Sequence, residues 1–228
     1  MPLASYCHRC GSSRSLWAWP AGLVVTLIGG GRFYYAAPLT LVVLAAGMVE
    51  SERLDRTRSV AWCVALAAVS AVVTGLPVLP ESTVGSSPIA AVNTALGETI
   101  GWPELTRQVA TIVHGLPPQD QHHVVLLALT YGEAGALDRF GPALGLPPAY
   151  SGHNSYADFR RPSDPDAVVV SVRFQPEELA PYFDTCDQVG TIDDGHDVDN
   201  EAQGQPLMVC RGVREGWDAI WASLRMLS

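Results

Sequence analysis

Three long apolar runs without a charged residue occupy the first 80 residues of this chain. They cover residues 15–31, 33–49 and 59–80, and short segments bearing arginine separate them. A membrane-spanning helix needs about 20 mostly apolar residues, with about 17 as the lower limit. The runs therefore predict three transmembrane spans within residues 1–80, and buried helices of a soluble domain are the alternative.

The arginines around these runs predict how the spans are oriented. Arg9 and Arg14 precede the first run, and three arginines lie in residues 50–59, between the second and third runs. Segments rich in Arg and Lys stay in the cytoplasm. We therefore expect a multi-pass protein of the cell membrane whose region after the third run lies outside the cytoplasm.

Charge divides the chain at the same place. Up to residue 80, six arginines accompany three acidic residues, whereas residues 81–228 contain eight arginines and twenty acidic residues. Such a split favours two regions in different surroundings. Membrane lipid is the predicted surrounding of the first region, and no nucleic-acid partner is predicted for the chain.

The second region has the pattern of an α/β domain. After a linker at residues 81–101, predicted helices and buried strands alternate through residues 102–228. Helices are predicted at 101–116, 133–145, 175–190 and 216–227, and strands at 122–132, 167–174 and 206–213. Because such alternation is typical of parallel sheets, we expect a small α/β domain with a mostly parallel sheet.

Residues 130–141, TYGEAGALDRFG, have the order strand, glycine turn, helix that can bind phosphate at a helix N-terminus. Only Gly132 and Gly135 are present, which is short of the three glycines of the dinucleotide fingerprint. Glu133 would also place a negative charge where a phosphate should lie. Close packing of the strand against the helix is the preferred explanation of both glycines.

The most polar cluster of the chain is SGHNSY, residues 151–156. It is not the G-x-S-x-G turn on which hydrolytic serines sit, so a catalytic Ser151 is not predicted. His153, Asn154 and Tyr156 follow a predicted strand and helix, where they would bind hydroxyl groups of a sugar or a lipid head group. A loop that only hydrogen-bonds to itself is the alternative.

Neither the acidic stretch nor the cysteines predict a metal centre, and no cofactor is predicted. Residues 191–204 hold five carboxylates, but an EF-hand counted from Asp197 needs glycine where Ala202 stands. The triplet 197–199 has the D-x-D form of metal-dependent sugar transferases, which is a match of three letters. Cys186 and Cys210 lie in the exported region, where a disulfide can form between them.

Three segments of the chain together resemble a known family. They are residues 29–54 (GGGRFYYAAPLTLVVLAAGMVESERL), 131–156 (YGEAGALDRFGPALGLPPAYSGHNSY) and 191–212 (TIDDGHDVDNEAQGQPLMVCRG). They are similar to bacterial, actinobacterial-type members of glycosyltransferase family 39, which is related to the protein mannosyltransferases. Its members transfer a sugar from a polyprenyl-phosphate donor to an acceptor outside the cytoplasm. The resemblance implies that this chain is the C-terminal portion of such a membrane glycosyltransferase.

The resemblance also implies roles for several residues. Arg32, Tyr34 and Tyr35 would line a lipid-phosphate site at the outer membrane surface, although tyrosines are common there in any case. Family members usually carry lysine at the position of Arg32. The acceptor or the cleft would be lined by His153, Asn154 and Tyr156.

The family's catalytic acidic residues lie in an N-terminal extracytoplasmic loop that has no counterpart in this sequence. No catalytic residue is therefore predicted, and transfer would need an N-terminal partner chain to supply the base. The alternative function is a membrane-tethered extracytoplasmic module that binds envelope glycan or a partner protein.

Overall fold

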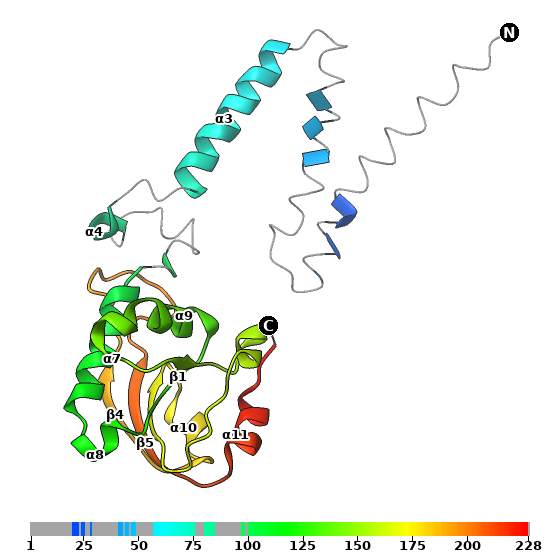
Figure 1. Cartoon of the computed structure of the whole chain (residues 1–228). Coiled ribbons are helices and arrows are strands. Elements are labelled where there is room, and N and C mark those ends of the chain that lie inside the picture. The colour runs from blue at the N-terminus through cyan, green and yellow to red at the C-terminus, as the bar shows by residue number, and fades with distance from the viewer. Residues whose placement is uncertain are drawn as a thin grey trace, which may run out of the picture. The chain divides into compact units, whose positions relative to one another are not determined.

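The computed structural model consists of two compact units, Met1–Val72 and Val73–Ser228. It describes residues 57–75, 80–84 and 100–227, together with short stretches at 20–22, 24–25, 28, 41–42, 44–45, 47–48 and 97–98. The first unit holds most of helix α3 (Thr57–Gly75), and the second holds a sheet with helices packed on it (Figure 1).

The prediction of three membrane spans at 15–31, 33–49 and 59–80 is wrong. In the described part of the chain, no helix is long and apolar enough to cross a membrane. The third run shows the physical reason, because α3 carries Arg58 in its first turn and ends at Gly75, ahead of Pro77. The apolar part of this helix is therefore shorter than the apolar run in the sequence. The first two runs lie largely outside the described residues.

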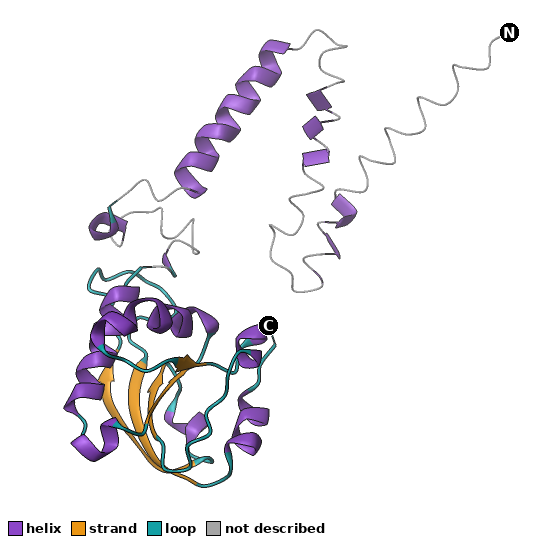
Figure 2. Cartoon of the chain, viewed as in Figure 1, coloured by secondary structure: helices purple, strands orange, loops and turns teal. Residues whose placement is uncertain are grey.

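The second unit is built on a sheet, drawn in orange in Figure 2. The sheet is mixed, and its five described strands lie in the order β2-β1-β3-β5-β4. β1 pairs in parallel with β2 and β3, whereas β5 is antiparallel to both β3 and β4. The strands are β1 (Val124–Ala128), β2 (Ala149–Tyr150), β3 (Val168–Val172), β4 (Phe183–Thr191) and β5 (Pro206–Val213). β1, β3 and β5 confirm the three predicted strands.

The prediction of a mostly parallel sheet is wrong, and one segment explains the difference. The sequence predicts a helix over 175–190, but only α10 (Pro176–Leu179) is helical there, and β4 follows it. Pro181 cannot continue a helix, and Phe183 and Thr185 belong to the residue types that favour strands. β4 forms an antiparallel pair with β5 along its length, and β5 is in turn antiparallel to β3.

The edge strand β4 is tied to its neighbour covalently and is irregular at one point. Cys186 of β4 lies opposite Cys210 of β5, and the two form a disulfide. The pairing register then shifts between Gln188 and Gly190. A bulge of this kind bends a strand and increases its twist.

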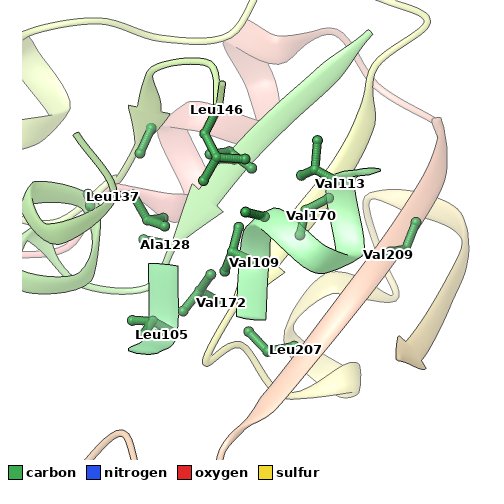
Figure 3. Packing of buried hydrophobic residues seen from close by; sticks show 14 of the residues in the cluster. Leu105, Val109, Val113, Ala128, Leu137, Leu146, Val170, Val172, Leu207 and Val209 are labelled. Atoms are coloured by element: carbon green, nitrogen blue, oxygen red, sulfur yellow. The ribbon is translucent and has the colours of Figure 1, made fainter. Parts of the chain in front are cut away.

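Helices cover both faces of the sheet. On one face, α7 (Trp102–Gly115) and α9 (Tyr131–Phe140) pack against the strands through the cluster shown in Figure 3, in which Val109 and Leu137 are fully buried. On the other face, α10 and α11 (Trp217–Leu224) pack around Phe183 and Met208. The 3-10 helices η2 (Gly141–Leu144) and η3 (Asn154–Asp158) and the short α8 (Pro118–Gln121) complete the described helices of these layers.

The segment predicted as a linker, residues 81–101, contributes to the core of the second unit. It contains α4 (Glu81–Val84), and Val84 and Ile100 are buried together with Val198. Asn200 reinforces this contact by donating a hydrogen bond of 3.3 Å from its amide to the carbonyl of Gly97.

Candidate functional site

Polar side chains gather at the carboxyl ends of β1 and β3. The chain leaves β1 into α9, returns through β2, and then crosses to β3 on the other side of β1. Open α/β sheets bind their ligands at such a topological switch point. Thr130 and Tyr131 follow β1, and Arg173 follows β3 directly, so this edge is the candidate site.

A connected set of charged groups lies at this edge. Glu133 is only 1 % exposed and accepts hydrogen bonds from the backbone N–H and the hydroxyl of Thr130. It also pairs with the Arg173 guanidinium at 2.8 Å, and a second nitrogen of that guanidinium pairs with Glu201 at 2.7 Å. A carboxylate thus already occupies the N-terminus of α9, the place at which a phosphate would bind.

Sequence reasoning assigned no role to two residues of this site, Tyr131 and Arg173. The φ of Arg173, +74°, is left-handed, which is rare for any residue other than glycine, and its side chain is 15 % exposed. Burial alone lowers the pKa of Arg173, but its hydrogen bonds to Glu133 and Glu201 outweigh burial and raise it. A sequence signal does exist, because Arg173 is the single arginine between residues 162 and 210 and directly follows a buried strand.

The SGHNSY segment is fixed by the tail of the chain. The N–H of Met226 donates to the carbonyl of Gly152 at 2.9 Å, and the N–H of Asn154 donates to the carbonyl of Met226 at 2.7 Å. A Cβ atom on Gly152 would lie 2.1 Å from the carbonyl oxygen of Leu224. Only glycine therefore allows the end of α11 to approach this loop.

Within this segment, His153 contacts the exposed ring of Tyr131, the first residue of α9. The rings of His153 and Tyr131 lie 4.9 Å apart between centroids, and Tyr131 is 51 % exposed. Asn154 follows with a φ of +51°, a conformation that asparagine tolerates. Ser151 is buried, and its hydroxyl donates to the carbonyl of Leu129 at 3.3 Å, which makes it part of the scaffold.

Tyr156 contacts the second half of α9 instead. Its hydroxyl and the guanidinium of Arg160 both donate to Oδ2 of Asp138, and the N–H of Ala149 donates to Oδ1 at 2.9 Å. Burial, followed by the hydrogen bond to Asp138, raises the pKa of Tyr156 to about 12. The three residues predicted to bind a sugar or head group therefore do not share one set of contacts. His153 contacts Tyr131, and Tyr156 contacts Asp138.

The acidic stretch forms a loop that hydrogen-bonds to itself. Asp194 is 4 % exposed and accepts from the N–H groups of His196 and Val198 at 2.7 and 3.1 Å. Asp194 packs so closely on Gly101 that a Cβ on this glycine would lie 2.5 Å from the Cβ and 2.9 Å from the Cα of Asp194. In the described part of the chain, no group of three or more His, Cys, Asp or Glu side chains is arranged to hold a metal ion.

The structure bears on the glycines of α9 but not on the predicted lipid-phosphate residues. Close packing does not explain the glycines of α9, because a Cβ on Gly132 would make only ordinary contacts, the nearest at 3.4 Å, and one on Gly135 would meet nothing within 4 Å. The predicted lipid-phosphate residues lie outside the described residues; they are Arg32, Tyr34 and Tyr35.

This edge combines exposed side chains with a buried, paired carboxylate. Tyr131 offers an exposed aromatic face beside the imidazole of His153, and Glu201, whose side chain is 68 % exposed, offers a carboxylate that is paired with Arg173. The buried carboxylate of Glu133 is held by Thr130 and Arg173 and is not placed to take a proton from a ligand.

Comparison of the chain with family models, curated proteins and solved structures finds no match.

Proposed function

We propose that the second unit is a non-catalytic recognition domain that binds carbohydrate of the cell envelope at the carboxyl ends of β1 and β3. The observation that carries this proposal is the pair of Tyr131 and His153, whose rings lie 4.9 Å apart at the same sheet edge as the ion pair of Arg173 and Glu201. A sugar ring has an apolar face for an exposed aromatic ring and hydroxyl groups for charged hydrogen-bond partners. Sites of this kind combine aromatic surface with a few fixed polar groups.

The charges at this edge disfavour a phosphorylated or acidic glycan. Arg173 is paired with two carboxylates, those of Glu133 and Glu201, so the set carries one net negative charge, which repels phosphate. General-base chemistry needs a carboxylate within reach of the proton it removes. Glu133 is instead buried and fully engaged, which supports binding without transfer.

The disulfide supports a location outside the cytoplasm. Cys186 and Cys210 are joined across β4 and β5, and disulfides persist in oxidising compartments but are rare in the cytosol.

We further propose a role beside lipid-linked sugar transfer, which rests on the resemblance of residues 131–156 and 191–212 to glycosyltransferase family 39 that the sequence alone suggests. In this role the domain holds the acceptor glycan, while an N-terminal partner chain supplies the catalytic carboxylate and binds the polyprenyl-phosphate sugar. Both similar segments contribute to the edge, the first with Tyr131 and His153 and the second with Glu201. No cofactor is needed for this function.

Binding of neutral envelope polysaccharide by the full chain tests the proposal. We expect saturable binding of mannan or arabinogalactan in calorimetric titration, and an affinity at least about fivefold lower for Tyr131→Ala, because an aromatic contact is worth about 1 kcal/mol or more. Val189→Ala is the matched control, since Val189 is 48 % exposed on the distant edge strand β4. Equal affinity for Tyr131→Ala and the unaltered chain would refute the site.

A further inference from the structure

A second polar site lies beside the edge strand β2, away from the switch point. It is a cavity of about 290 Å³ at the C-terminal end of α9, lined by Asp138, Pro142, Leu146, Pro147, Pro148 and Arg160. Small-molecule sites range upward from about 300 Å³, so its size suits one small ring. We propose that this cavity binds a single neutral sugar ring, separately from the glycan site proposed at Tyr131 and His153.

The carboxylate in this cavity is fixed in position before any ligand arrives. Asp138 receives the N–H of Ala149 on one oxygen and both the Tyr156 hydroxyl and the Arg160 guanidinium on the other. A carboxylate has about four acceptor positions. These three donors hold it in one orientation and leave it the capacity to accept one hydroxyl hydrogen from a ligand.

The guanidinium beside it supplies the complementary donors. Arg160 has five N–H groups in a fixed planar fork, and its side chain is 35 % exposed, against 24 % for Asp138. A ligand with two neighbouring hydroxyl groups can donate from one to Asp138 and accept at the other from Arg160. Neighbouring hydroxyls at this spacing are the recurrent feature of a pyranose.

The remaining walls are apolar and fit the face of such a ring. Pro142, Pro147 and Pro148 carry no side-chain polar group, and Leu146 is 7 % exposed and packs into the core beneath them. Proline rings are rigid, so the wall costs little conformational entropy when a ligand covers it. The C–H groups of one sugar face would lie against this surface.

The charges in the cavity decide the class of ligand. Asp138 and Arg160 form an ion pair, so the site as a whole is neutral. A phosphorylated or acidic sugar would meet the carboxylate, and an amino sugar would meet the guanidinium. An uncharged hexopyranose avoids both penalties.

This cavity and the switch-point edge are separate places on α9. Tyr131 begins the helix and Asp138 lies seven residues later, which corresponds to roughly 10 Å along the helix axis. The same short loop reaches both, His153 toward Tyr131 and Tyr156 toward Asp138. The second site does not depend on the first, and either can fail alone.

Nuclear magnetic resonance of the labelled full chain tests the proposal, with methyl α-D-mannopyranoside and methyl β-D-galactopyranoside as neutral probes and D-glucuronate as the charged one. We expect the amide signals of Ala149 and Arg160 to shift saturably, in the millimolar range, with at least one neutral probe. Arg160→Met should abolish the shift of Ala149. Arg139→Met is the matched control, because Arg139 is exposed on the same helix and lies over the ring of Phe140.

Three outcomes would overturn the inference. They are the absence of a saturable shift with either neutral probe, equal binding by D-glucuronate, and an unchanged response in Arg160→Met. Tyr156→Phe removes one hydrogen bond to Asp138 while keeping the ring, so a folded variant with weakened binding would support the site even if Arg160→Met were poorly folded. Tyr131→Ala should leave this binding intact, which separates the result from that for polysaccharide.

Discussion

Arg173 and Glu133 form an ion pair of 2.8 Å that joins the end of β3 to the first turn of α9. The carboxylate is 1 % exposed, and the arginine holds a left-handed backbone conformation with a φ of +74°. Strained backbone of this kind persists only where surrounding contacts fix it, and it gathers at functional sites. The pair is therefore the anchor of the proposed recognition edge.

Loss of Arg173 should destabilise the domain, and the size of the loss should depend on the replacement. Arg173→Ala leaves the Glu133 carboxylate buried without its partner, which costs about 3 kcal/mol. Arg173→Gly loses the same pair but relieves a backbone strain of about 1 kcal/mol, so its unfolding free energy should be the higher of the two. Chemical denaturation of both variants measures the difference, and a less stable glycine variant would contradict it.

Removal of the disulfide should lower stability without changing the sheet. Cys186 and Cys210 close a loop with a sequence separation of 24 residues, for which the loss of chain entropy in the unfolded state predicts about 3 kcal/mol. The double replacement by alanine, compared in denaturant titration with the oxidised parent, checks this value. Cys63→Ala is the control, because Cys63 is free and exposed and should leave the transition unchanged.

Stability should depend on pH through the pair of His123 and Asp164. The hydrogen bond of 2.7 Å to Asp164, followed by the attraction of its charge, raises the pKa of His123 above the ordinary 6.5. His123 in return lowers the pKa of Asp164 below 3.8. The histidine therefore contributes stability below about pH 6.5 that is lost as pH rises through its raised pKa. The aspartate's share is lost only in acid, as pH falls through its lowered pKa.

His123→Gln tests this dependence. The unaltered chain should lose more unfolding free energy than the variant between about pH 6 and about pH 8, the range of histidine titration. The measurement is denaturation at several pH values in low salt, because both side chains are partly exposed. Identical pH profiles for the two proteins would show that the pair does not contribute.

Gly152→Ala should displace the residues after α11 from the SGHNSY segment. Its Cβ would lie 2.1 Å from the carbonyl oxygen of Leu224, whereas a Cβ on Gly135, inside α9, would meet nothing within 4 Å. We expect the first change to cost more than about 2 kcal/mol and to weaken polysaccharide binding. Gly135→Ala should instead stabilise the helix by up to about 1 kcal/mol. Thermal unfolding and the polysaccharide titration measure both effects.

The sequence predicted the continuous apolar strands well, because β1, β3 and β5 are buried runs that only a central strand accommodates. It failed where local pattern competes with pairing. β4 alternates too weakly, with mostly exposed residues, and only its partner β5 reveals it as a strand. It failed again at the contact between Arg173 and Glu133. This contact forms only because β3 lies beside β1 in the sheet, and a local sequence pattern does not reveal which strands are neighbours.

The irregular pairing of β4 bears on how this domain behaves at high concentration. A flat, regular edge strand presents unpaired backbone groups to which another molecule can add a strand, which is a route to aggregation. β4 is exposed along most of its length, but its register shift between Gln188 and Gly190 and the charges of Asp184 and Asp187 interrupt that template. The strand that closes the sheet is thereby protected against self-association.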